Sequence, residues 1–425
     1  MRTSIVAAFA LAVCAVPFAQ GCSQEVADDD AGEDAITSNE AGFVDFDFDG
    51  EVIAAKETDA AKAISSQLFY TIGDLTAFNA NSRVGQHETT NVKTSDAGGG
   101  LVKVTFHAKL PVAWPKGKTI PRKYQVTVPK HVDSEGLSAF VDKYDGPCGK
   151  DEYGKATFWH DFQPKAPGCT LAPADVTSVS AKVSRRKDVT TGKYPEYKEV
   201  WKDDALKVVA IFGYAEGGGA SDIGQRQYEE FVTGVAATLP GAKRTEKKSA
   251  SIAKDVTLEG KVTGPAGQAR TVVVTSLLID TLYTAGRDFD DRYDAISEGA
   301  DLVVYNGHSE LSKNTNALAR KGKVAKEKYQ LFFFDSCDTF AYLDTALVDR
   351  RKEVNGASDP KGSKYLDVVT NVLPSYFMNY AGSSLTFYKA LLDDKSPKTY
   401  NQILEGLPSD QVVVVSGEED NAFRP

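Results

Sequence analysis

The sequence predicts an α/β fold: a mostly parallel sheet flanked by helices, preceded by a β-rich N-terminal domain. From about residue 205, continuous apolar runs alternate with segments of helical spacing, which is typical of a parallel sheet buried on both faces. Between residues 43 and 204, shorter runs with period-two alternation are separated by Gly, Pro and Lys turns, which indicates strands. A chain of 425 residues is long enough for both domains and a leader.

The first 22 residues predict an export signal. Arg2 precedes an apolar run over residues 5–18 that is short for a membrane helix. The run ends at Cys22, in a context that resembles a lipoprotein signal whose cysteine is acylated; plain secretion is the alternative. We favour the lipoprotein, because residues 23–42 are acidic, lack Lys and Arg, and are typical of an extended linker. The protein is therefore expected in the cell envelope, as an outer-membrane lipoprotein, or else secreted.

Composition limits the partners. A net charge of −10 without a Lys/Arg stripe excludes nucleic acid as the expected partner, but not a protein or peptide substrate. Since no other stretch is long and apolar, we expect membrane contact only through the N-terminal lipid. The histidines at 87, 107, 131 and 160 lack metal-site spacing, so neither a metal nor a cofactor is expected.

The five cysteines fall into distinct classes. Cys14 leaves with the signal, and Cys22 is the predicted lipidation site. Cys148 and Cys169 flank a short loop in an exported protein, which predicts a disulfide. Cys337 is then the unpaired thiol, and an inert buried cysteine is a common alternative to a reactive one.

The β-rich domain, residues 43–204, includes one segment of helical spacing at 61–78 and a hairpin expected over 177–201. Inside the predicted disulfide loop lies Trp159-His160-Asp161-Phe162, which could form a recognition surface, although we favour a packed loop.

In the second domain, residues 205–425, strands and helices alternate. A glycine loop at 216–222 follows the first strand, and we expect it to shape a wall of a cleft. The polar segment 348–364 is expected to be a solvated loop. The predicted strands of this domain are 205–215, 271–280, 301–310, 329–340 and 411–416. Its predicted helices are 225–239, 288–300, 314–322 and 385–392.

Two residues that could perform chemistry follow neighbouring predicted strands. The apolar run that begins at Leu302 stops before His308, and the run that begins at Leu331 stops before Cys337. Adjacent parallel strands place their last residues about 5 Å apart, and an imidazole beside a thiol can take its proton. The alternative is that each residue merely caps its strand.

These segments resemble the caspase-hemoglobinase group of cysteine peptidases, which includes caspases, metacaspases, clostripain and gingipains. The resemblance covers roughly residues 205–345, in the order of strand–helix units that precede the histidine and cysteine strands. The motifs that carry it are similar to the metacaspase patterns Y-S-G-H-G and D-S-C-H-S-G; here they are Tyr305-Asn306-Gly307-His308-Ser309 and Asp335-Ser336-Cys337-Asp338-Thr339.

The resemblance implies a caspase-like fold and a role for each residue. Cys337 would be the nucleophile and His308 the general acid/base. The backbone N–H groups of Ser309 and Cys337 would form the oxyanion hole. Asp335 would bind a basic side chain, which implies cleavage after Arg or Lys; a turn former at the strand end is the alternative. If Asp335 does select basic residues, Arg350 and its neighbours become a candidate self-processing site.

The sequence thus predicts an exported, lipid-anchored, caspase-like cysteine endopeptidase with a dyad of His308 and Cys337. The alternative is a non-catalytic envelope lipoprotein that uses a degenerate form of the same fold as a binding module.

Overall fold

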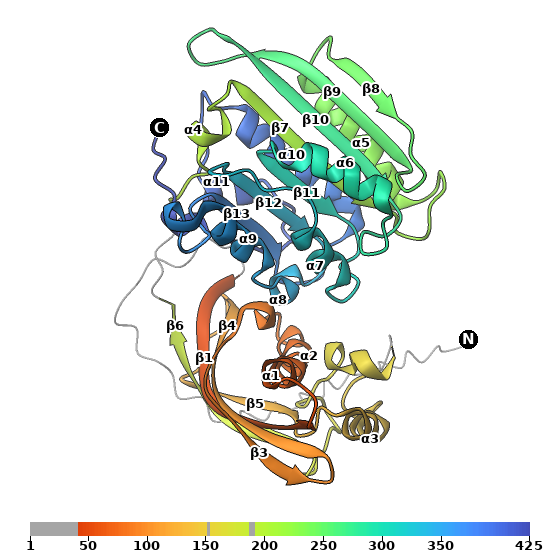
Figure 1. The fold of residues 1–425 in the computed structure, drawn as a ribbon, viewed down its shortest axis with the longest axis vertical. Coiled ribbons are helices and arrows are strands. Elements are labelled where there is room, and N and C mark those ends of the chain that lie inside the picture. Colours follow the sequence, from red (N-terminus) through yellow and green to blue (C-terminus); the bar gives the residue numbers. More distant parts are fainter. Residues whose placement is uncertain (1–40, 151–153, 187–191) are drawn as a thin grey trace, which may run out of the picture.

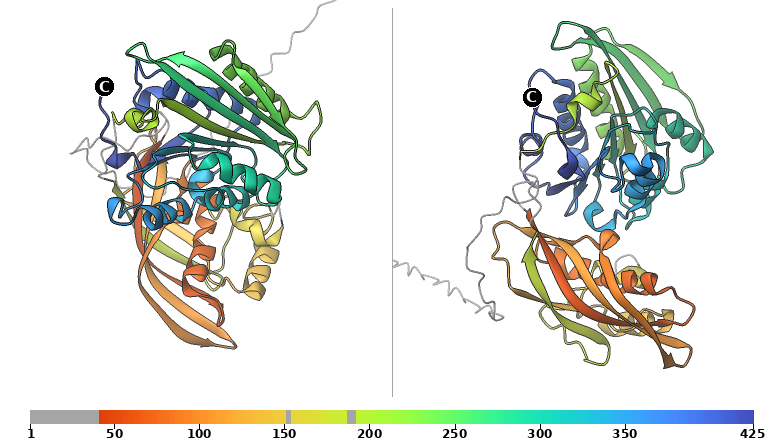
Figure 2. Two further views of the ribbon diagram at one scale, coloured as in Figure 1. Left: turned by 45° about the horizontal axis from the view of Figure 1, so that its top comes forward. Right: turned by 60° about the vertical axis from the view of Figure 1, so that its left-hand side comes forward.

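The computed structural model describes residues 41–150, 154–186 and 192–425. It is a mixed α/β structure with one sheet in each half of the chain (Figures 1 and 2). The predicted signal peptide, Cys22 and most of the acidic linker lie outside the described residues.

The N-terminal sheet is antiparallel, in the order β2-β4-β1-β6-β5, with β3 paired to the outer part of β4. It curves around a group of short helices (Figure 1). The strands are β1 (Ala41–Ala55), β2 (Asn81–Ser82), β3 (Glu88–Gly98), β4 (Leu101–Pro115), β5 (Lys123–Pro129) and β6 (Val176–Arg185). The helical segments are α1 (Ala60–Leu68), α2 (Tyr70–Thr76), η1 (Val84–Gln86), α3 (Ser134–Tyr144) and η2 (Lys155–His160).

Alternation along β1 explains why the helices collect on one face. Val44, Phe46 and Phe48 point into the core that the helices cover, whereas the alternating residues Asp47 and Asp49 remain accessible. The predicted helical segment 61–78 is confirmed as α1 and α2, and Asp59 caps α1 by accepting from the backbone of its first turn.

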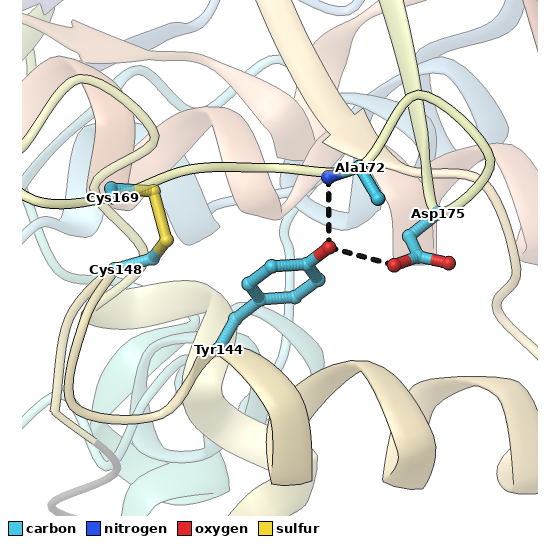
Figure 3. Close-up of a disulfide and its surroundings, with 5 residues drawn as sticks. All are labelled: Tyr144, Cys148, Cys169, Ala172 and Asp175. Carbon is cyan, nitrogen blue, oxygen red and sulfur yellow. Dashed lines mark hydrogen bonds between the residues drawn. A yellow bond between two sulfur atoms is a disulfide. The ribbon is translucent and has the colours of Figure 1, made fainter.

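The predicted disulfide between Cys148 and Cys169 is confirmed, with a Cα–Cα distance of 4.7 Å (Figure 3). Close to it, the Tyr144 hydroxyl donates to Asp175 at 2.7 Å and accepts from the backbone N–H of Ala172 at 2.9 Å. These contacts tie the C-terminal end of the segment that contains η2 to helix α3 and to the turn that follows it.

The C-terminal sheet has the order β14-β13-β12-β11-β7-β10-β9-β8. Its five central strands are parallel, and β8, β9 and β14 are antiparallel additions at the two edges. The strands are β7 (Ala205–Gly213), β8 (Lys243–Lys247), β9 (Lys254–Thr263), β10 (Ala269–Ile279), β11 (Leu302–Asn306), β12 (Gln330–Asp335), β13 (Leu366–Asn371) and β14 (Val413–Ser416).

Helices cover both faces of this sheet (Figure 1). Successive residues of β11 alternate between two cores: Val304 packs toward α5 and α10, and Val303 packs toward α6, α7 and α9. The helices are α4 (Tyr197–Val200), α5 (Ile223–Thr238), α6 (Arg287–Ser297), α7 (Lys313–Arg320), α8 (Thr339–Tyr342), α9 (Ala346–Asn355), α10 (Tyr380–Leu392) and α11 (Tyr400–Leu404).

Two local predictions are wrong. The segment expected to complete a hairpin forms helix α4, whose Tyr197 and Val200 pack in the core of the second domain. The first half of the segment expected to be a solvated loop lies in helix α9. Arg351 on this helix is fully buried and donates to Gln330, and Arg350 donates to backbone carbonyls at the end of α7. These hydrogen bonds hold both arginines in place, and Arg351 is not accessible at the surface.

The two domains pack directly against each other where α8 lies (Figure 1). Phe43 of β1 and Phe340 of α8 lie 5.6 Å apart, centroid to centroid, in a small apolar cluster shared by both domains. The Asn81 side chain of β2 donates to the Val372 carbonyl at 2.8 Å. A Cβ on Gly85 would lie 2.5 Å from the Leu343 carbonyl oxygen, so this contact requires glycine.

Removal of the disulfide should weaken the N-terminal domain. Since the bond closes a loop of 21 residues, a Cys148→Ala/Cys169→Ala double variant should lose about 3 kcal/mol of unfolding free energy. Urea denaturation followed by tryptophan fluorescence would measure the loss. Cys337→Ala, which leaves the loop closed, serves as the control. A double variant as stable as the wild type would contradict the prediction.

Candidate active site

His308 and Cys337 lie at one edge of the C-terminal sheet, as predicted. Strands β11 and β12 are adjacent and parallel, and their last residues, Asn306 and Asp335, are paired in register. The chain runs two residues beyond each strand to reach His308 and Cys337. Both residues line the same cavity, which has a volume of about 610 Å³.

This edge coincides with the point where the strand order reverses. In chain order the parallel strands are β7, β10, β11, β12 and β13, and in space they are arranged 2-1-3-4-5. The first and third strands, β7 and β11, are neighbours whose connections leave toward opposite faces, and this opens a crevice at their carboxyl ends. His308 follows β11 at that crevice.

A backbone carbonyl after β7 orients the His308 ring. Nε2 of His308 lies 3.0 Å from the carbonyl oxygen of Ala215. Because a carbonyl only accepts, Nε2 carries the proton, and in the neutral ring Nδ1 is the nitrogen able to accept one. The ring also packs edge-on against Phe377, with 4.8 Å between centroids.

Asp222 organises the loop that presents Ala215. Its carboxylate accepts from the backbone N–H groups of Ala215, Glu216, Gly218 and Gln225, at 2.8 to 3.3 Å. Burial alone would raise the pKa of Asp222, but these four hydrogen bonds outweigh it and lower the pKa. The glycines of the loop do not line the cavity; the loop contributes through the Ala215 carbonyl, and the prediction that it forms a wall is wrong.

The Cys337 thiol is shielded and protonated at neutral pH. Burial, and then the charge of Asp338, raise the pKa of Cys337 to about 11. The thiol donates to the Ser375 carbonyl oxygen at 3.6 Å. Within the described residues, no hydrogen bond links Cys337 to His308. In this arrangement each member of the pair is held by a backbone carbonyl.

Two backbone N–H groups beside these side chains have no acceptor. Within the described part of the chain, neither Ser309 nor Cys337 donates its N–H to another protein group. Ser309 has a negative φ, so the position does not require glycine. The next three residues, Glu310, Leu311 and Ser312, all have positive φ, between 46° and 91°. Such backbone conformations are costly for residues with side chains and concentrate at functional sites.

Asp335 lies beneath the cavity and does not line it. The residue is 0% exposed, and its Oδ1 accepts from Asn371 at 3.0 Å and from Gln411 at 2.7 Å. Burial raises the pKa of Asp335 to about 7. A substrate side chain would reach it only after these covering residues moved, so its assignment to substrate binding stays a prediction.

Asp338, next to the thiol, is paired with the N-terminal domain. It is almost fully buried, and its carboxylate accepts from Asn81 at 3.0 Å and lies 3.8 Å from Nε2 of His160. Burial alone would lower the pKa of His160, but hydrogen bonds to Asp161 and Asp338 raise it to about 9. His160 is therefore a cation at neutral pH, and it compensates the charge of Asp338.

The N-terminal domain also supplies a wall of the cavity, which the sequence did not predict. Phe69, Thr157, Trp159 and His160 line it together with His308 and Cys337. The only sequence signal was the aromatic and charged run inside the disulfide loop, for which we favoured a packed loop; a recognition surface was the alternative.

The described residues contain neither a cluster of potential metal ligands nor a helix that could cross a membrane. No group of three or more His, Cys, Asp or Glu side chains there is placed to hold a metal ion. None of the helices in those residues combines the length and the apolar character that crossing a bilayer requires. No protein-family model matches the sequence, and no curated protein matches it.

The ion pair between His160 and Asp338 should make the stability of the protein depend on pH. Because the folded-state pKa of His160 is about 9, above its usual value of 6.5, its contribution is complete below about pH 6.5 and is lost as the pH rises through about 9. The difference in unfolding free energy between wild type and His160→Gln should therefore shrink between these values. Denaturation at several pH values would measure it, with His107→Gln on the N-terminal sheet as the control. A difference that grows with pH would contradict the assignment.

Removal of the Asp338 charge should make Cys337 more reactive. In Asp338→Asn the side-chain oxygen can still accept from Asn81, but the charge that raises the pKa of the thiol is gone. The rate of alkylation by iodoacetamide at about pH 8 should rise by roughly two- to fivefold, since a larger thiolate fraction is partly offset by lower nucleophilicity. Intact-mass spectrometry would follow the reaction, with Asp96→Asn on exposed strand β3 as the control. An unchanged or slower rate would refute the effect.

Proposed function

We propose that the protein is an exported, lipid-anchored cysteine endopeptidase with a caspase-like catalytic domain, in which Cys337 and His308 act as nucleophile and general acid/base. The observation that carries this proposal is the placement of both residues after register-paired parallel strands, lining one cavity. Two further features support it: the unpaired N–H groups of Ser309 and Cys337, and the fixed tautomer of His308.

The chemistry follows from these groups. The Cys337 proton passes to Nδ1 of His308, and the sulfur adds to the carbonyl carbon of the peptide bond. The oxygen that becomes negative accepts from the N–H groups of Ser309 and Cys337. His308 then gives its proton to the departing amine, which leaves a thioester on Cys337. Water hydrolyses the thioester, releasing the acid and restoring the thiol.

The raised pKa of Cys337 means that substrate must help to activate it. A chain that enters the cavity would displace water around the thiol and bring a carbonyl carbon to the sulfur, so that proton transfer to His308 and bond formation can occur together. The hydrogen bond from the thiol to Ser375 would break in the same step.

A second candidate function is a non-catalytic binding module in the cell envelope. The resting state of Cys337 favours this function. The thiol is protonated, with a pKa of about 11, and its hydrogen bond goes to a backbone carbonyl and not to His308. Under this alternative the cavity would bind a ligand and Cys337 would be a partly buried structural thiol.

Loss of either side chain should abolish hydrolysis. Cys337→Ala should reduce peptide cleavage by on the order of 10⁴-fold or more, and His308→Ala by about 10²- to 10⁴-fold. The measurement is mass-spectrometric detection of cleavage products from a peptide mixture incubated with the purified protein. His107→Ala, which changes a histidine on the N-terminal sheet, should retain activity. Cleavage that survives in Cys337→Ala would eliminate the peptidase proposal for this site and favour the binding module.

A further inference from the structure

We infer that the interdomain cavity is an aromatic subsite that binds a large apolar side chain of a polypeptide substrate, next to the bond that Cys337 attacks. This inference rests on the proposed peptidase function and names its substrate class. It differs from the cleavage after Arg or Lys that the sequence resemblance implies.

Aromatic rings of both domains line the cavity that contains the thiol. Phe69 and Trp159 pack together at 4.9 Å between centroids, and Trp159 meets Tyr342 of α8 edge-on at 5.9 Å. Leu311 and Pro374 line the same cavity on the side of the C-terminal domain. Clustered rings of this kind gain most from burying another apolar group.

The charges around the cavity oppose a basic side chain. The carboxylate of Asp338 is compensated by His160, and Asp335 is sealed beneath the surface. Glu310 and Lys313 both line the cavity and are both exposed, so their opposite charges offset each other. Aromatic faces also attract cations, but His160, protonated at neutral pH, packs edge-on against Trp159 at 5.8 Å and would repel an incoming cation.

The aromatic wall is held rigidly, as a specificity pocket requires. Trp159 lies on η2, inside the segment closed by the disulfide. Helix α2 packs so closely against it that a Cβ on Gly73 would lie 2.7 Å from the Trp159 carbonyl oxygen. The volume of about 610 Å³ is in the range of ~300–1,000 Å³ that is usual for sites that enclose a ligand group.

The apolar surface continues past the nucleophile. Tyr376 and Met378, which follow the carbonyl that accepts from Cys337, are 55% and 74% exposed. Phe377 between them packs on His308. Exposed apolar residues grouped beside a site are typical of a surface that binds a partner chain.

Covalent labelling tests the subsite without relying on turnover. Peptidyl chloromethyl ketones that end in Phe, Arg or Gly would be reacted with the full chain, and intact-mass spectrometry would measure labelling of Cys337. In this step the sulfur displaces chloride to form a thioether, and the thiol proton passes to the buffer. Each rate would be divided by the iodoacetamide rate of the same variant, which removes differences in thiol reactivity.

We expect the Phe reagent to label at least about tenfold faster than the Arg and Gly reagents. Trp159→Ala and Phe69→Ala should remove most of this preference. Phe78→Ala is the matched control, since Phe78 is also half-buried in the N-terminal domain, packs on Lys118 and Lys165, and does not line the cavity. If Trp159→Ala does not fold, Phe69→Ala and the wild-type ratios decide the question.

The outcomes separate this inference from the proposed function. Faster labelling by the Arg reagent, or a Phe preference that survives both aromatic variants, would overturn the aromatic subsite while leaving a cysteine peptidase in place. If all three reagents label at the same normalised rate and no peptide is cleaved, the peptidase function itself fails, and the subsite with it.

Discussion

The register between β11 and β12 is the constraint on which the site depends. A shift of one residue in this pairing would turn every side chain of β12 to the opposite face and bring a different residue past the strand end. The register is held from both faces, because Val303 and Phe332 pack into one core while Val304 and Phe333 pack into the other. Thus the same burial that stabilises the centre of the sheet also fixes the separation of the two reactive groups.

Much of this architecture could be predicted from the sequence, because the central strands are long apolar runs. Strands β7, β10, β11 and β12 are buried on both faces and carry few polar residues, so their pattern has one simple interpretation. Strand β13 escaped prediction because it includes buried Asp367 and Asn371. Asp367 accepts from Tyr329 at 2.5 Å and from Asn421 at 2.6 Å, partners that lie far away in sequence and leave no local periodicity.

Helix α9 and the aromatic wall also could not be predicted from local sequence patterns. Helix α9 buries Arg351 through a hydrogen bond to Gln330, so its inward face looks polar and was predicted to be a loop. Trp159 lines the site only because the N-terminal domain docks on α8, through contacts such as that between Phe43 and Phe340. Periodicity describes one element at a time; it cannot place two domains against each other. The sequence therefore predicted the side chains at the edge of the sheet, but not the aromatic wall that the N-terminal domain adds to the same cavity.

Docking of the domains also determines the electrostatic environment of the Cys337 thiol. Asp338 has φ 54° and is almost fully buried beside Cys337, where an uncompensated carboxylate would be costly. Asn81 and His160 of the N-terminal domain supply the hydrogen bond and the counter-charge that make this burial tolerable. The first domain is thus part of the site in two respects, since it balances the charge next to the thiol and forms the apolar wall above it. A C-terminal domain without this partner would leave Asp338 unpaired and the cavity open to water. The electrostatic environment of the thiol and the apolar wall of the cavity therefore both depend on the same interdomain contact.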